Sequence, residues 1–170
     1  MRRAFVAPDW SERLAQAGLP DLTSLLERGR PMSQRPGTWH ALTKPGLGGR
    51  ERWRWELAGA GGDVLYLKRY EHVRLAEQLD RIRRQSPRHS RAWWEFHQSA
   101  ELARQYVPVV RAVGVAEDVR FPFEVRSAVL FEEVPGDAFD RIWPRLCREN
   151  APLARGLARH DLTRRLARFV

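Results

Sequence analysis

The segment Val64-Leu65-Tyr66-Leu67-Lys68-Arg69-Tyr70 decides the fold, because it is an apolar run with one lysine near its end. A short run of this kind with glycines before it is typical of a buried β-strand. The chain has 30 basic residues, and only Lys44 and Lys68 are lysines. A compact, point-like ammonium group therefore occupies one strand position in a chain that otherwise uses arginine.

Two further strands are predicted before this segment, each separated from the next by a glycine-rich turn. Trp39 to Thr43 is the first, and the alternation of tryptophan or leucine with charged residues over 52–57 predicts the second. The turns between the strands are expected at 44–50 and 58–63, each with three glycines. The order is therefore strand, turn, strand, turn, strand.

Helix and strand signals alternate in the rest of the chain. Residues 71–85 are polar and charged and are expected to form a helix or a loop. Ser86 and Pro87 predict the start of a helix that ends at Pro108. An amphipathic helical region is predicted at 9–28, interrupted at Pro20. Strands are predicted at 109–115 and 125–132 with a turn at Glu117-Asp118 between them, and helices over 138–170.

We therefore expect an α+β fold with a five-stranded antiparallel sheet, one central helix, an N-terminal helix and trailing C-terminal helices. The expected boundaries are a helical extension and linker at 1–37, the sheet region at 38–136 and a helical segment at 137–170.

The composition restricts the class of protein. The net charge of +9 indicates an anionic partner such as a nucleotide, nucleic acid, anionic lipid or phosphorylated sugar, although a solvated basic surface also explains it. The single cysteine, Cys147, excludes an intramolecular disulfide and a cysteine zinc site, and it is compatible with a cytoplasmic location. We expect no signal peptide and no membrane-spanning segment, and peripheral membrane contact through basic residues stays open.

Four segments in order resemble the bacterial lipopolysaccharide kinases of the Kdo/WaaP family, which have a protein-kinase-like fold. The segments are VLYLKRY (64–70), SRAWWEF (90–96), VPVVRAVGV (107–115) and SAVLFEEVPG (127–136). The resemblance covers roughly residues 38 to 140 and corresponds to the small, N-terminal lobe of such a kinase. It implies phosphoryl transfer from ATP and Mg²⁺ to a sugar hydroxyl of the lipid A-core, at the inner membrane face.

The resemblance assigns roles to individual residues. Lys68 would contact the α- and β-phosphates of ATP, and Glu95 would orient Lys68. Glu132 and Glu133 would lie in the hinge, where backbone groups contact adenine. The glycines of the first turn would let backbone N–H groups approach the phosphates, and these glycines are Gly46, Gly48 and Gly49.

The catalytic part of the family pattern is missing from the sequence. A kinase needs a His-x-Asp loop followed by an asparagine, and a second aspartate that holds magnesium. His160-Asp161 lacks both the intervening residue and the asparagine, so we assign no catalytic and no metal-binding residue. We therefore expect the 170-residue chain to be inactive alone, as a truncated kinase or as one half of a split kinase with a separate large-lobe chain.

Each assignment has a structural alternative. Lys68 could be a surface lysine at a strand end, Glu95 a solvated helix residue, and the first turn a plain hairpin turn without the G-x-G-x-x-G spacing. Two other functions stay open, namely a non-catalytic partner protein and a basic nucleic-acid-binding module. Trp53 and Trp55 alternate with Arg52 and Arg54, which separates aromatic from basic side chains and argues against the nucleic-acid alternative.

Overall fold

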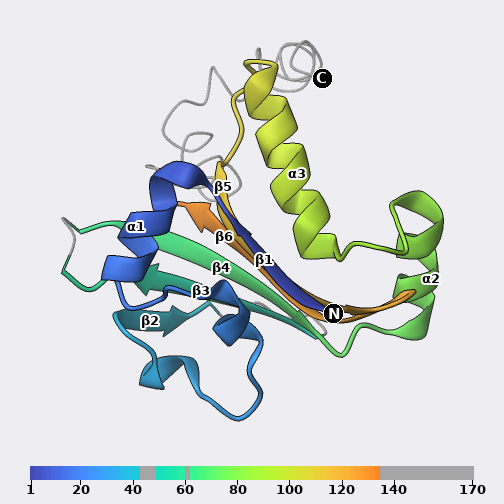
Figure 1. The fold of residues 1–170 in the computed structure, drawn as a ribbon, viewed down its shortest axis with the longest axis horizontal. Helices are drawn as coiled ribbons and strands as arrows, with labels where there is room; N and C mark the ends of the chain where they lie inside the picture. Colours follow the sequence, from blue (N-terminus) through green and yellow to red (C-terminus); the bar gives the residue numbers. More distant parts are fainter. Residues whose placement is uncertain (43–48, 60–61, 135–170) are drawn as a thin grey trace, which may run out of the picture. The chain divides into compact units, whose positions relative to one another are not determined.

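The computed structural model describes residues 1–42, 49–59 and 62–134. In this part of the chain three α-helices accompany a six-stranded sheet, and every neighbouring pair of strands is antiparallel. The strands follow one another across the sheet in the order β1-β5-β6-β4-β3-β2 (Figure 1). The α+β class and the antiparallel sheet are therefore confirmed.

The strands are β1 (Arg2–Val6), β2 (Thr38–Ala41), β3 (Arg50–Glu56), β4 (Val64–Glu71), β5 (Ala112–Arg120) and β6 (Phe123–Glu132). The helices are α1 (Pro8–Gln16), α2 (Leu75–Arg84) and α3 (Arg91–Arg104), with two short 3₁₀ helices, η1 (Leu22–Leu26) and η2 (Met32–Gln34). The helices predicted over 138–170 lie outside the described residues.

The prediction of five strands is wrong, because β1 adds a sixth at the edge of the sheet. Its sequence, RRAFV, shows no alternation between apolar and polar residues that would mark a strand. It pairs along its whole length with β5, from Arg2 opposite Asp118 to Val6 opposite Gly114. The strand is therefore specified by tertiary pairing rather than by its own pattern.

The turn predicted at Glu117-Asp118 is also wrong. Both residues lie inside β5, opposite Ser127 and Arg126 of β6, and both are buried. The chain turns instead at Phe121 and Pro122, after which β6 begins. Two consecutive acidic residues favour a turn in isolation, but here buried partners hold them in the strand.

The sheet has a hydrophobic core on each face. Leu65 and Leu67 of β4, with Trp55 of β3 and Leu130 of β6, pack against α1, the loop after it and η1. The N-terminal helical region forms α1 and η1, and the interruption expected at Pro20 is found between them. This layer covers the face that carries the odd-numbered residues of β4.

The other core lies beneath α3 and contains Tyr70, Val115, Val129 and Phe131. The helix contacts β4, β5 and β6, and Figure 1 shows it beside β5 and β6. It begins after Ser90, whose side chain accepts a hydrogen bond from the backbone N–H of Trp93, so the predicted cap at Ser86 is wrong. The segment before it, for which a helix or a loop was expected, forms the helix α2, so the described residues between β4 and β5 contain two helices rather than the one central helix expected.

Candidate functional site

Lys68 and Glu95, which the sequence analysis paired, are in contact in the structure. Lys68 lies on β4 and Glu95 on α3, and the Nζ atom of Lys68 donates a hydrogen bond to Oε2 of Glu95 at 2.7 Å. Their side chains are 36% and 30% exposed, so the pair lies at the border of the α3 core and remains open to solvent. The ammonium group also lies 4.7 Å from the centre of the Phe131 ring.

Tyr70 is a third member of this group that the sequence analysis did not assign. Its hydroxyl donates a hydrogen bond to Oε1 of Glu95, so each oxygen of this carboxylate has one donor. Burial, followed by the nearby negative charge of Glu95, raises the pKa of Tyr70 and keeps the phenol protonated. Tyr70 and Lys68 are two residues apart on β4, so both point to the face covered by α3.

A row of arginines on β3 extends this basic surface. Arg52 lies directly opposite Lys68 in the β3–β4 register, so the two side chains share one face of the sheet. Arg50 and Arg54 lie on the same face, opposite Tyr70 and Tyr66. Arg54 pairs with Glu56 and Glu133, whereas Arg52 forms no ion pair with any other described residue. The charge of Arg52 is therefore available to an anion bound beside Lys68.

The two acidic residues predicted for the hinge lie at the end of β6: Glu132 is the last residue of the strand, and Glu133 follows it. Oε1 of Glu132 accepts hydrogen bonds from the Trp10 indole at 2.8 Å and from Arg111 at 3.1 Å. Oε1 of Glu133 accepts one from the Tyr66 hydroxyl at 3.2 Å. Both backbone N–H groups are hydrogen-bonded inside the fold, to Arg111 and Val64. An adenine contact at this edge would therefore have to use other backbone groups.

Of the three glycines assigned to the phosphates, only Gly49 lies within the described residues, and Gly46 and Gly48 lie outside them. Gly49 immediately precedes β3, and its carbonyl oxygen accepts a hydrogen bond from the backbone N–H of Glu71 at 2.8 Å. A Cβ atom at this position would overlap the carbonyl oxygen of Glu71. Close packing of two backbones therefore explains this glycine without any ligand.

The position of Glu95 depends on how the start of α3 is held, and two buried carboxylates hold it. Oε2 of Glu117 accepts a hydrogen bond from the backbone N–H of Ser90 at 2.7 Å, and Oε2 of Glu124 accepts one from Arg91 at 3.1 Å. Negative charge at a helix N-terminus is favourable, because the first N–H groups and the helix dipole face it.

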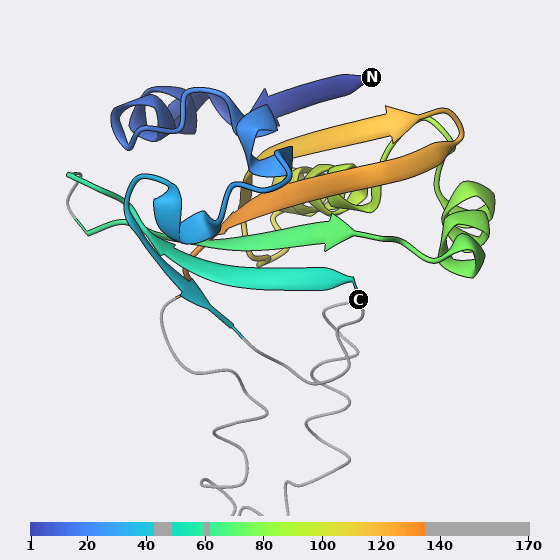
Figure 2. The ribbon, with the colours of Figure 1, turned by 90° about the horizontal axis from the view of Figure 1, so that it is seen from below.

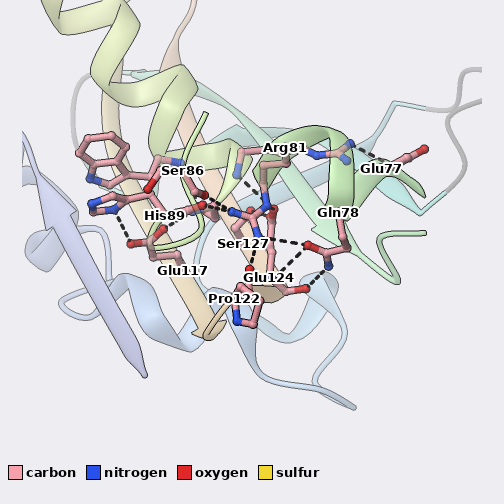
Figure 3. A network of polar contacts seen from close by, with 12 residues as sticks. Glu77, Gln78, Arg81, Ser86, His89, Glu117, Pro122, Glu124 and Ser127 are labelled. Atoms are coloured by element: carbon pink, nitrogen blue, oxygen red, sulfur yellow. Dashed lines mark hydrogen bonds and ion pairs between the residues drawn. The ribbon is translucent and has the colours of Figure 1, made fainter. Parts of the chain in front are cut away.

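Arg81 of α2 connects this polar network to the rest of the fold. Its guanidinium donates to the carbonyl oxygens of Ser86, His89 and Pro122, and its Nε lies 3.6 Å from Oε2 of Glu124 (Figure 3). Burial raises the pKa of Glu124 and lowers that of Arg81. The network fixes the loop before α3 and so sets the direction in which Glu95 meets β4.

A surface pocket of about 320 Å³ lies beside this network rather than at Lys68. Its lining includes Arg50, Arg84 and Arg91, together with Glu77 and Asp80. Arg91 pairs with Glu77 at 3.0 Å and Arg84 with Asp80 at 2.7 Å. These internal pairs neutralise part of the positive charge of the lining.

The tryptophans of β2 and β3 serve packing. Trp55 is fully buried, and the Trp39 ring stacks on it with centroids 4.7 Å apart. Trp53 is partly buried against the same core, on the face opposite Arg52 and Arg54. The aromatic and basic side chains of β3 therefore lie on different faces, as its alternation predicted.

The signals for the residues that the sequence analysis missed were weak. Glu117 and Glu124 lie in or beside apolar runs, and acidic residues there are easily mistaken for turn residues. Arg52 could have been found from the strand register, because alternation along β3 and β4 places it on the face of Lys68.

The comparisons with known proteins give no assignment: no family model, no curated protein and no solved structure matches the chain.

Proposed function

We propose that the described part of this chain is the nucleotide-binding lobe of a kinase-like protein, and that Lys68 binds the phosphates of ATP. The observation that supports this proposal is the contact between Lys68 on β4 and Glu95 on α3. A strand lysine held by a helix glutamate is the arrangement with which protein kinases bind the α- and β-phosphates. The carboxylate holds the lysine in one rotamer, so less side-chain entropy is lost when the nucleotide binds.

The charge around the pair also supports a polyphosphate ligand. Arg52 lies opposite Lys68 on the same face of the sheet, and the side chain of Lys68 stays partly exposed although it is paired. Two adjacent cations attract a polyphosphate, whereas the single carboxylate of Glu95 is already occupied by Lys68 and Tyr70. The geometry therefore suits an anion with several charged oxygens.

The position of Glu132 and Glu133 agrees with a nucleotide that lies along β6. Val129 is opposite Lys68, and Glu132 lies three residues further along the strand. Three residues of β-strand span about 10 Å, which is comparable to the separation of the base and the β-phosphate in an extended nucleotide. The adenine would thus lie near the Glu132–Glu133 edge when the phosphates are at Lys68.

The described residues suit a phosphate ligand but offer no site for a magnesium ion. Among the residues 1–42, 49–59 and 62–134, no group of three or more histidine, cysteine, aspartate or glutamate side chains could hold a metal ion. Lys68, Arg52 and Glu95 can bind and orient phosphates, but they provide neither a metal site nor a base for an acceptor hydroxyl. We therefore propose nucleotide binding here and derive no step that uses Mg²⁺.

The resemblance to the Kdo/WaaP family suggests the reaction in which such a lobe takes part. The proposed acceptor is a sugar hydroxyl of the lipid A-core, and a separate large-lobe chain would supply the catalytic groups that this sequence lacks. The net charge of +9 favours binding of an anionic acceptor and attraction to the cytoplasmic surface of an anionic membrane.

Calorimetric titration with ATP and Mg²⁺ tests the proposal on wild type, Lys68→Ala and a control, Arg104→Ala. Arg104 is an exposed arginine of α3 whose only ion pair among the described residues is with Glu101 on the same helix. We expect measurable affinity in wild type and the control, and a Kd at least about tenfold higher in Lys68→Ala, since a hydrogen bond to a charged group contributes about 1.5–3 kcal/mol. Equal affinity of all three proteins, each folded by circular dichroism, would refute the proposed role of Lys68.

A further inference from the structure

At one end of the sheet, α2 and the turn between β5 and β6 carry exposed apolar side chains. Leu75 and Leu79 lie one turn apart on α2 and are 64% and 55% exposed, and Phe121 in the turn is 72% exposed. Phe123, which begins β6, is also exposed. Large apolar side chains that gather on a surface commonly mark a site of interaction.

The helix and the turn form one surface because polar contacts join them. Arg81 of α2 donates to the carbonyl oxygen of Pro122 at 2.6 Å, and Gln78 of α2 hydrogen-bonds both backbone groups of Glu124. Figure 2 shows α2 and the β5–β6 turn at the same end of the sheet. Since Gln78 and Arg81 face inward, Leu75 and Leu79 are left on the outer side of α2.

Arginines without ion pairs surround these apolar residues. Arg74, Arg83 and Arg120 are exposed, and none of them forms an ion pair with another described residue. Over 72–90 the sequence has five arginines against Glu77 and Asp80, and both acidic side chains are paired with arginines. The surface therefore carries both exposed apolar side chains and positive charge without an ion-pair partner among the described residues. We name it the α2 patch and define it by Leu75, Leu79, Phe121, Phe123, Arg74, Arg83 and Arg120.

We propose that the α2 patch docks the protein on the surface of an anionic lipid bilayer. An amphipathic helix with leucines on one side and arginines beside them inserts its apolar side chains at the boundary of headgroups and acyl chains. Each arginine near an anionic leaflet adds to the attraction. A lipid surface satisfies both features of the patch, since it accepts apolar side chains and provides negative charge at any angle around them.

This docking is peripheral. No helix in the described part of the chain combines the length and the apolar composition that crossing a bilayer requires. The patch shares no residue with the surface around Lys68 and Glu95, so the two proposals can fail independently.

Vesicle co-sedimentation tests the proposal with phosphatidylcholine vesicles and with vesicles that also contain phosphatidylglycerol. The proteins are wild type, Leu75→Ser/Leu79→Ser, Phe121→Ser and a control, Tyr106→Ser, which removes a 94% exposed side chain that lies just after α3. We expect wild type and the control to bind only the anionic vesicles well. The leucine double variant should have a partition coefficient at least about tenfold lower, because it loses two inserted apolar side chains. Phe121→Ser should show a smaller loss, and salt should weaken all binding.

Two results would overturn the proposal. The first is equal binding of wild type and both patch variants, which would mean that charge alone holds the protein to the lipid. The second is no binding of wild type to anionic vesicles. If gel filtration then shows a dimer that Leu75→Ser/Leu79→Ser dissociates, the patch binds a second copy of the chain instead of lipid. An ATP titration of the same variants separates this result from the nucleotide proposal.

Discussion

Lys68 Nζ lies 2.7 Å from Glu95 Oε2, although the two residues are 27 positions apart and lie on different elements. The pair is accessible to solvent, and the hydroxyl of Tyr70 donates a hydrogen bond to the other carboxylate oxygen, Oε1 of Glu95. An exposed ion pair contributes about 1 kcal/mol of stability at most. A modest contribution to folding is compatible with a role of the pair in binding.

Glu95→Gln should lower the affinity for ATP with little effect on folding. The amide keeps the volume of the side chain but loses the charge that fixes Lys68, so we expect Kd to rise severalfold while the free energy of unfolding changes by about 1 kcal/mol or less. A double-mutant cycle with Lys68→Ala should be non-additive, because both changes disrupt the same contact. Calorimetry and urea unfolding measure the two quantities, and additive losses in ATP affinity would show that the residues act separately.

The Lys68–Glu95 contact was expected from the resemblance to the kinase family, and the local patterns placed each residue on the right kind of element. The apolar run of β4 placed the lysine on a strand, and the segment Ser90 to Phe96 placed the glutamate near the start of a helix. The sequence pattern did not predict that the N-cap of α3 is Ser90 rather than Ser86. The position of the cap depends on Glu117, which lies 27 residues away along the chain and accepts the N–H of Ser90.

Apart from Arg52, the features that the sequence analysis missed depend on tertiary contacts. The strand β1 has no periodicity of its own and exists because β5 offers an unpaired edge. Glu117 and Asp118 look like turn residues until Arg2 and Arg3 of β1 pair with them, Arg3 at 2.5 Å from Glu117. A pattern within one segment cannot report partners that arrive from the other end of the chain.

Arg52→Ala should weaken ATP binding, because Arg52 is the second cation on the face of Lys68. We expect a severalfold higher Kd and a shallower dependence of Kd on salt, since one charge-assisted contact to phosphate is lost. Arg54→Ala is the matched control from the same strand and face, because Arg54 is already paired with Glu56 and Glu133. An equal or larger effect of Arg54→Ala would mean that Arg52 is not a phosphate contact.

Arg81→Leu should destabilise the fold strongly. The side chain is 1% exposed and donates to three backbone carbonyls, and its removal leaves Glu124 buried without its cation. Breaking a buried pair in this way costs about 3–5 kcal/mol. Arg84→Leu on the same helix is the control, because the Arg84–Asp80 pair is exposed and contributes about 1 kcal/mol at most. Urea unfolding that gave similar losses for both variants would contradict the assigned role of Arg81.

Glu124 should make the stability of the protein fall as the pH rises. Burial raises the pKa of this carboxyl above its ordinary value, so between the unfolded and the folded pKa the native state holds a proton that the unfolded state has released. The free energy of unfolding therefore decreases across this window, and the contribution of Glu124 is largest below the unfolded pKa.

Glu124→Gln isolates this effect, because glutamine has the same shape and cannot titrate. We expect the stability of wild type relative to Glu124→Gln to be greatest near pH 4 and to decline as the pH rises above the ordinary glutamate pKa of about 4.3. Denaturant unfolding of both proteins from about pH 4 to pH 8 gives the difference directly, and all other groups shared by the two proteins largely cancel in it. A difference that grows with pH would mean that Arg81 and the start of α3 hold the carboxylate more strongly than burial opposes it, and that the pKa of Glu124 is lowered instead.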